Sequence, residues 1–177
     1  MRKLKNEELN RISKEEFKDR QKTPMALVLD NVRSMNNVGS IFRTADAFLL
    51  EGIYLCGITS QPPHREIEKT ALGATSTVAW KYFKNVSEAI RELKRQDYLI
   101  VSVEQTDNNI PLNKFFPLPE KKYALIFGHE MKGISEEAIQ MSDLALEVPQ
   151  YGTKHSLNIA VCAGIVIWDI YSKLQKS

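Results

Sequence analysis

Short polar residues gather near the C-terminus, where an apolar segment begins. Residues 151–174, YGTKHSLNIAVCAGIVIWDIYSKL, open with a glycine, a histidine, a serine and an asparagine and then take on the character of a buried helix. Ser156 is expected to cap that helix, with Asn158 in its first turn. Such a helix start can also give a ligand short, rigid hydrogen bonds. The sequence leaves both interpretations open.

Three further polar segments each follow a short apolar run. They are DNVRSMNNVGS (30–40), EQTDNN (104–109) and GHEMKGIS (128–135). The C-terminal polar residues, PQYGTKHSLN (149–158), likewise follow an apolar run. Gly, Asn and Ser allow close backbone approach and expose N–H groups. Ligands of parallel α/β sheets bind beyond the carboxyl ends of the strands. These segments are therefore the candidates for a binding site.

Several common chemistries lack their motifs. Neither G-x-x-x-x-G-K-[ST] nor G-x-G-x-x-G occurs, which disfavours a nucleoside triphosphate site, and without G-x-S-x-G a serine hydrolase is a weak hypothesis. No carboxylate or cysteine stands at metal-ligand spacing from a histidine, so no metal is expected. The histidines are His64, His129 and His155.

Single candidate residues also have ordinary structural interpretations. Arg43 lies in an apolar stretch, where an arginine commonly extends its charge to solvent. Asn37 is typical of a loop or cap. GHEMKGIS on its own is typical of a strand-to-helix turn in which Ser135 caps the next helix.

Apolar runs of strand length alternate with segments of helical period. Expected strands are residues 25–30, 52–57, 98–104, 123–128 and 144–148, and expected helices are 38–50, 86–96, 135–141 and 151–174. Such alternation predicts an α/β fold with a mostly parallel sheet and helices on both faces. The proline-containing segments 59–65 and 111–119 are expected to be loops.

A chain of 177 residues is expected to form one domain, residues 25–177, after an N-terminal helical extension, residues 1–24. Apolar side chains recur at roughly helical spacing between residues 3 and 21: Leu4, Leu9, Ile12 and Phe17. The formal net charge of +2 is compatible with binding an anion but too mild to identify a nucleic-acid partner.

Two features bear on location. Cys56 and Cys162 lie inside apolar runs, which is typical of reduced core thiols. The N-terminus lacks the apolar region of a secretory signal, and the longest apolar run, residues 159–168, is much shorter than the roughly 20 residues that span a bilayer. A cytoplasmic protein without a membrane segment is expected.

Three segments, taken in order, resemble the motifs of the SpoU or TrmH-like branch of the SPOUT RNA methyltransferases. NNVGSIFRTADAF (36–48) resembles the N-x-G-x-x-x-R-T-x-x-A-F pattern, GHEMKGIS (128–135) resembles G-x-E-x-x-G-[IL], and VPQYGTKHSLNIAVCAG (148–164) resembles [IV]-P-x-x-G-x-x-x-S-L-N. The likeness runs from about residue 25 to residue 174.

The resemblance implies a C-terminal trefoil knot, a fold feature too rare for periodicity to suggest. It also implies S-adenosylmethionine as the methyl donor, a ribose 2′-hydroxyl of tRNA or rRNA as the acceptor, and a homodimer whose interface contributes to the active site. The positions that match the family's cofactor contacts are Val103, Glu104, Gly128, Val148 and Leu157.

The resemblance further implies a catalytic set formed by Asn37, Arg43, Glu130, Ser156 and Asn158. A ribose hydroxyl is a poor nucleophile until it loses its proton, so orientation and proton removal are what the site must provide. An arginine keeps its proton at neutral pH, so it is a weak candidate for a free base. Our hypothesis is that Arg43 binds an RNA phosphate and stabilises the developing alkoxide.

Two other functions are weighed against this one. The first is a non-catalytic RNA-binding or ribosome-associated protein with the knotted fold, which would have no need of the whole catalytic set. The second is an α/β enzyme that acts on a small adenine-containing ligand. The basic residues of the extension are as consistent with a solvated face as with RNA contact, since acidic residues dilute their charge.

Overall fold

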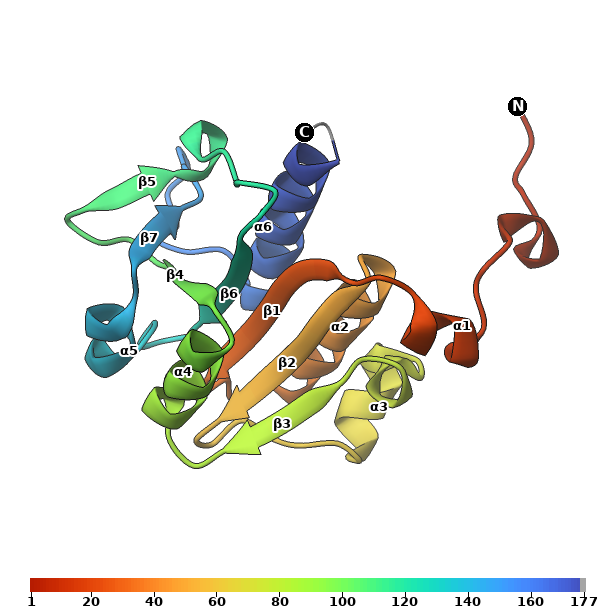
Figure 1. The fold of residues 1–177 in the computed structure, drawn as a ribbon, viewed down its shortest axis with the longest axis horizontal. Helices are drawn as coiled ribbons and strands as arrows, with labels where there is room; N and C mark the ends of the chain where they lie inside the picture. Colours follow the sequence, from red (N-terminus) through yellow and green to blue (C-terminus); the bar gives the residue numbers. More distant parts are fainter. Residues whose placement is uncertain (176–177) are drawn as a thin grey trace.

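The computed structural model describes residues 1–175 and contains, in that part of the chain, a seven-stranded sheet in the order β3-β2-β1-β6-β4-β7-β5 (Figure 1). The strands are β1 (Thr23–Asp30), β2 (Leu50–Cys56), β3 (Trp80–Phe83), β4 (Tyr98–Val103), β5 (Asn109–Pro111), β6 (Lys122–Phe127) and β7 (Leu144–Glu147). Every pairing between these strands is parallel. The carboxyl ends of all of them therefore point to one edge of the sheet.

Helices cover both faces of the sheet. They are α1 (Lys14–Asp19), α2 (Met35–Ala47), α3 (Arg65–Ala71), α4 (Val86–Arg95), α5 (Glu136–Met141) and α6 (Ile159–Leu174). One buried cluster joins the sheet to α2, α3 and α6, and a second joins it to α4 and α5 (Figure 1). This arrangement confirms the expected α/β class with a parallel sheet between two helical layers.

The central strands have apolar side chains on both faces because helices cover both. Side chains of β1 and β6 alternate between the two clusters: Leu27 and Leu125 belong to the α2 side, and Val28 and Ile126 belong to the α4 side. Leu27 pairs with Leu125 in the register, so the two face the same cluster. Continuous apolar runs in the sequence are the consequence of this double burial.

The packing of α2 on α3 depends on a glycine. A Cβ atom at Gly39 would lie 2.2 Å from the Ile67 carbonyl oxygen and 2.2 Å from Thr70 Oγ1. Both distances are far below van der Waals contact, so a larger residue would push the two helices apart.

The expectation of one helix over residues 3–21 is wrong. The segment contains a short 3₁₀ turn, Asn6–Leu9, and then α1. Asn10 has a φ of 45°, which ends the turn. Ser13 then caps α1: its hydroxyl accepts the Glu16 N–H, and Glu16 in turn accepts the Ser13 N–H. This S-x-x-E capping box was a readable start signal that the apolar spacing obscured.

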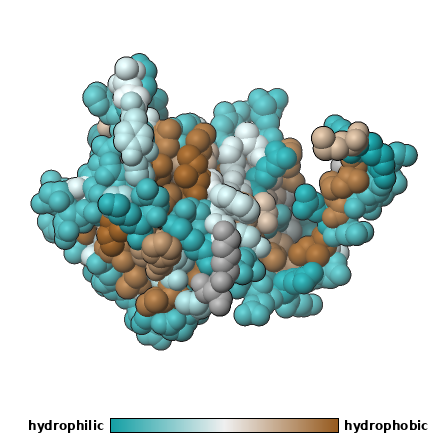
Figure 2. Space-filling model, turned by 90° about the horizontal axis from the view of Figure 1, so that it is seen from above, coloured by the Kyte–Doolittle hydropathy of each residue, from teal (hydrophilic) through white to brown (hydrophobic). Residues whose placement is uncertain are grey.

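The N-terminal segment packs on the domain through the buried Phe17 and the partly buried Ile12. Phe17 is 3% exposed and belongs to the larger core cluster, whereas Leu4 and Leu9 are exposed. Figures 1 and 2 show the first residues standing away from the rest of the molecule, with apolar atoms on their surface.

The expected strands and helices from residue 25 onward are present, although the last helix begins at Ile159 instead of near residue 151. Three short elements were missed. α3 follows the segment expected as a loop, and β3 and β5 are edge strands with few buried side chains. Short, half-exposed elements leave little apolar pattern in a sequence. Within residues 1–175, no helix has the length and apolar character to cross a bilayer.

Candidate functional site

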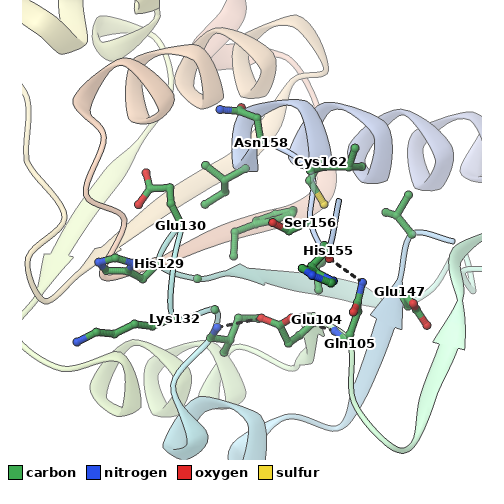
Figure 3. Close-up of a pocket in the computed structure, with 18 of the residues that line it drawn as sticks. Glu104, Gln105, His129, Glu130, Lys132, Glu147, His155, Ser156, Asn158 and Cys162 are labelled. Carbon is green, nitrogen blue, oxygen red and sulfur yellow. Dashed lines mark hydrogen bonds between the residues drawn. The ribbon is translucent and has the colours of Figure 1, made fainter. Parts of the chain in front are cut away.

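A cavity of about 640 Å³ lies beyond the carboxyl ends of β4, β6 and β7 (Figure 3). Two loops and the first turn of α6 enclose it: residues 128–135, which follow β6, and residues 148–158, which follow β7. Cavities of this size hold cofactor-sized ligands. The position is the one expected for a ligand of a parallel sheet.

The cavity collects the residues that the sequence assigned to cofactor binding. Its lining includes Val103, Glu104, Gly128, Val148 and Leu157. Three members of the expected catalytic set line it as well, namely Glu130, Ser156 and Asn158, and Figure 3 shows Asn158 at the start of α6 with Glu130 on the neighbouring loop.

The loop over residues 128–135 is folded back on itself. Gly133 has a φ of 70°, and it exchanges backbone hydrogen bonds with His129 at 3.0 and 2.8 Å. A Cβ atom at Gly128 would lie 2.2 Å from the Gly133 carbonyl carbon and from the Ile134 nitrogen. Glycine is therefore required at 128 for the loop to close in this form.

Carboxylates hold the far end of the same loop. Glu104 Oε2 accepts the Ile134 N–H at 3.1 Å, and the buried Asp30 accepts the Ser135 N–H at 2.9 Å through Oδ2. The Ser135 side chain makes no cap hydrogen bond to α5, contrary to the simple capping interpretation. Asp30 was not identified from the sequence, although an acidic residue at the end of an apolar strand was a signal.

Glu130 fastens the near end of the loop to the start of α2. Its carboxylate accepts the N–H groups of Arg33 at 3.0 Å and Ser34 at 2.9 Å, and the side-chain amide of Asn37 at 3.0 Å. Burial alone would raise the pKa of the Glu130 carboxyl, but hydrogen bonds from backbone N–H groups and from Asn37 outweigh it and lower the pKa. Glu130 is thus held ionised.

Asn37 continues this connection to α6. Asn158 Nδ2 donates to Asn37 Oδ1 at 3.2 Å, and Asn158 Oδ1 accepts the N–H groups of Ala160 and Val161 at 2.9 and 3.3 Å. Glu130, Asn37 and Asn158 therefore form one hydrogen-bonded chain across three segments distant in sequence.

The expectation that Ser156 caps α6 is wrong, because Asn158 is the cap. Asn158 has non-helical backbone angles directly before the first helical residue, so its side chain can fold back onto the free N–H groups. Ser156 lies two residues earlier, exposed in the loop and in the wall of the cavity.

Arg43 is not part of this cavity in its own chain. It is exposed on α2 and lines a second hollow with Lys69 and Thr70 of α3. Six residues separate it from Asn37, which is about 9 Å along a helix and a rotation of about 240°. The structure thus brings Asn37, Glu130 and Asn158 together, places Ser156 nearby, and leaves Arg43 on another face of α2.

The cavity has a negative electrostatic balance. Glu104, Glu130 and Glu147 line it, with Lys132 as the lysine among its walls. Gln105 and His155 also face it, and Gln105 Nε2 donates to the His155 carbonyl oxygen at 3.2 Å, which ties the β4 end to the 148–158 loop (Figure 3). Within residues 1–175, no group of three or more His, Cys, Asp or Glu could hold a metal ion.

A model of the SpoU rRNA Methylase family matches residues 24–168. The chain belongs to this family. The match includes β1 through most of α6, and so every segment that builds the cavity. It also includes all three segments whose motifs resembled this family in the sequence.

Individual members of the family are similar to this chain in sequence and in structure. A tRNA (guanosine(18)-2′-O)-methyltransferase of Borreliella burgdorferi is 28% identical over 153 residues, which are 86% of this chain and 68% of that protein. The AdoMet-bound rRNA methyltransferase of Sinorhizobium meliloti has a TM-score of 0.76 and 26% identity, over 86% of this chain and 58% of that one. This SpoU family chain thus spans about two thirds or less of these relatives.

A third relative shares the fold at lower identity. A structure concerning the 2-OH methylation of C/U34 on tRNA has a TM-score of 0.76 and 22% identity, over 88% of this chain and 100% of that chain. At this identity the likeness concerns the fold alone.

Proposed function

We propose that this SpoU family protein transfers a methyl group from S-adenosylmethionine to a ribose 2′-hydroxyl of tRNA or rRNA. The observation that carries the proposal is the hydrogen-bonded chain of Glu130, Asn37 and Asn158 at the mouth of the cavity. The names of the relatives support both acceptor classes, tRNA and rRNA, and a solved relative contains the methyl donor.

The cavity fits S-adenosylmethionine by size and by charge. The carboxylates of Glu104, Glu130 and Glu147 favour a ligand that carries a positive charge, as a sulfonium does. Apolar side chains such as Val148 and Leu157 are suited to an adenine ring, and the folded loop around Gly128 supplies backbone groups.

Bound S-adenosylmethionine supplies an electrophilic methyl group. Asn158 and Ser156 would orient the ribose hydroxyl toward the cavity, a role supported by the contacts through which Glu130 fixes Asn37 and the start of α2 and Asn37 meets Asn158. Such orientation supplies much of the rate of an in-line transfer. Arg43 would bind an RNA phosphate and stabilise the developing alkoxide, and that phosphate would accept the proton of the hydroxyl.

A homodimer and the trefoil knot are part of the proposal. Because Arg43 lies outside the cavity of its own chain, its part in the reaction requires a second copy that brings Arg43 to that cavity. α6 carries exposed Val161, Ile165 and Trp168 on one side, which supports an interface there. The adjacency of the 128–135 and 148–158 loops supports the knot, whose loops they would form.

The test is transfer of tritium from labelled S-adenosylmethionine to total tRNA and, separately, to rRNA from cells that lack this gene. We expect alkali-resistant label at one ribose in one of these pools. Arg43→Ala should abolish most of the transfer, and Arg43→Lys should also be poor because it loses the planar fork. Near-normal single-turnover transfer by Arg43→Ala would contradict the role of Arg43.

A non-catalytic RNA-binding protein is the second candidate, and a small adenine-containing substrate is the third. Cofactor binding shown by calorimetry, together with no label in either RNA pool, would favour one of these over the methyltransferase. Competition by adenine-containing ligands without any RNA binding would identify the third.

A further inference from the structure

An open groove of about 490 Å³ lies between α2 and α3, apart from the large cavity. α2 contributes Ser40, Arg43 and Thr44 to it, and α3 contributes Lys69 and Thr70. Ala47 and Phe48 form an apolar side. The motif in residues 36–48 includes Arg43, Thr44, Ala47 and Phe48, but no motif includes Lys69 or Thr70.

The hydroxyl groups of the groove are committed to the backbone. Ser40 and Thr70 donate to the Asn36 carbonyl oxygen at 2.8 and 3.0 Å, and Thr44 donates to the Ser40 carbonyl oxygen at 3.1 Å. The donors that remain for a ligand are the guanidinium of Arg43 and the ammonium of Lys69.

Neither cation is neutralised by a neighbour. In the part of the chain that the structure describes, neither Arg43 nor Lys69 has a carboxylate within ion-pair distance. The carboxylates of Asp46 and Glu68 instead accept hydrogen bonds from the hydroxyls of Thr77 and Thr75. Two unpaired cations on facing helices make the groove attractive to an anion.

We propose that this groove binds a phosphodiester of the substrate RNA and that Lys69 contacts the phosphate beside Arg43. The inference rests on the proposed function for its ligand. The planar guanidinium of Arg43 can donate two hydrogen bonds to phosphate oxygens, and the ammonium of Lys69 adds a compact positive charge beside it. The apolar side formed by Ala47 and Phe48 suits the adjoining ribose.

The groove is open to solvent, which favours an RNA strand over a small anion as its ligand. Both cations are exposed, so a single free phosphate would stay largely hydrated and gain little. An RNA strand instead brings several linked phosphates, and each contact releases counterions into solution. Contacts of this kind position the strand without reading its sequence.

The experiment compares Lys69→Gln, Lys69→Arg and Lys94→Gln in the full chain. Lys94 is a matched control because it is an exposed lysine on α4, on the opposite face of the sheet, with only a surface ion pair to Asp143. Binding of total tRNA and of rRNA is measured over a range of salt concentrations, and S-adenosylmethionine binding is measured by calorimetry.

Lys69→Gln is expected to weaken binding of the substrate RNA about 5- to 10-fold and to reduce the slope of log K against log salt by about 0.7 to 1, as for one lost phosphate contact. Its affinity for S-adenosylmethionine should not change. Lys69→Arg should retain RNA binding within about twofold, because it keeps the charge.

Equal RNA affinity and equal salt slope for Lys69→Gln and Lys94→Gln would overturn the inference. Inorganic phosphate is also added as a competitor and compared with another salt at equal ionic strength. If it displaces RNA more strongly than that salt from the wild type, but not from Lys69→Gln, the groove is a small-anion site and the RNA assignment is overturned. RNA binding is measured separately from methyl transfer. Failure of the wild-type protein to methylate RNA therefore counts against the proposed function, whereas the salt dependence of RNA binding still tests the groove.

Discussion

Glu130 is the residue on which the mouth of the cavity depends most directly. One carboxylate accepts hydrogen bonds from two backbone N–H groups and from Asn37, and Asn37 in turn contacts Asn158. The motif resemblance pointed to all three residues. It did not show that Glu130 acts on the start of α2, since that contact joins positions 93 to 97 residues apart.

Glu130→Gln tests this anchoring role. The amide places a donor against backbone N–H groups, so we expect a loss of about 2 kcal/mol in the free energy of unfolding at pH 7. The wild-type advantage should be full above the ordinary carboxyl pKa of 4.5 and should disappear as the pH falls through the lowered pKa of Glu130 in the folded protein. Urea unfolding of both proteins at a series of pH values measures it.

Glu137→Gln, on the exposed first turn of α5, is the control for that series. Its stability should track that of the wild type at every pH. A constant difference between wild type and Glu130→Gln down to strong acid would show that the charge of Glu130 is not what stabilises the loop.

The two cysteines should be poorly reactive in the folded protein. Burial raises the pKa of Cys56 to about 12 and that of Cys162 to about 11, from an ordinary value of 9.0. At pH 8 the native thiols should therefore react with a disulfide reagent on the order of 100-fold more slowly than the urea-unfolded chain. Fast labelling of native Cys162 would mean that the cavity opens to solvent beside α6.

At the scale of elements, the 128–135 loop is where the strands become a binding site. It closes through Gly128 and Gly133 and is held at its ends by Glu130, Asp30 and Glu104. The sequence predicted a strand-to-helix connection here. The two acidic residues that hold its far end lie 30 and 105 residues away, so no local pattern could reveal them.

Gly128→Ala should weaken S-adenosylmethionine binding by about tenfold or more, because its Cβ would lie 2.2 Å from backbone atoms that cannot move without opening the loop. Calorimetry measures the dissociation constant. Gly152→Ala in the facing loop is the matched control, since its Cβ would meet no atom within 4 Å and binding should change little. Equal effects of the two substitutions would contradict the role assigned to Gly128.

The N-terminal segment should be held to the domain by Phe17. Replacing this buried ring with alanine should cost about 3 kcal/mol in the free energy of unfolding, whereas Leu9→Ala, at an exposed position, should cost less than about 0.5 kcal/mol. Thermal or urea unfolding distinguishes them. A small effect of Phe17→Ala would show that α1 detaches without disturbing the core.

At the scale of the whole molecule, the role proposed for Arg43 requires a second copy, because its own chain directs Arg43 into a separate groove. α6 buries one side in the core and exposes Val161, Ile165 and Trp168 on the other. Figure 2 shows apolar side chains reaching the surface between hydrophilic ones. We proposed that a second copy covers the exposed side of α6.

Ile165→Glu should convert the proposed dimer to a monomer, because burying an unpaired carboxylate at an apolar interface costs several kcal/mol. Methyl transfer should fall as the molar mass in solution falls. Light scattering at working concentration measures the mass. Ile58→Glu, at an exposed position after β2, should change neither. A wild-type protein that is already monomeric and active would contradict both the dimer and the shared site.

By itself, the sequence determined the order and type of the main elements, because runs buried on both faces must be apolar throughout and amphipathic helices must repeat near 3.6 residues. Its motifs also singled out residues that line the cavity, such as Gly128, Glu130 and Asn158, together with Arg43, which lines another groove. α3, β3 and β5 escaped prediction because short or edge elements bury too little to leave a period.

Only the tertiary structure decided which groups meet. It placed the cap of α6 at Asn158 instead of Ser156, because capping depends on the backbone angles at the helix start and not on residue type alone. It joined Glu130, Asn37 and Asn158, and it set Arg43 beside Lys69 in a different groove. Such contacts depend on strand order and helix rotation, which are properties of the packed chain and not of any local stretch of sequence.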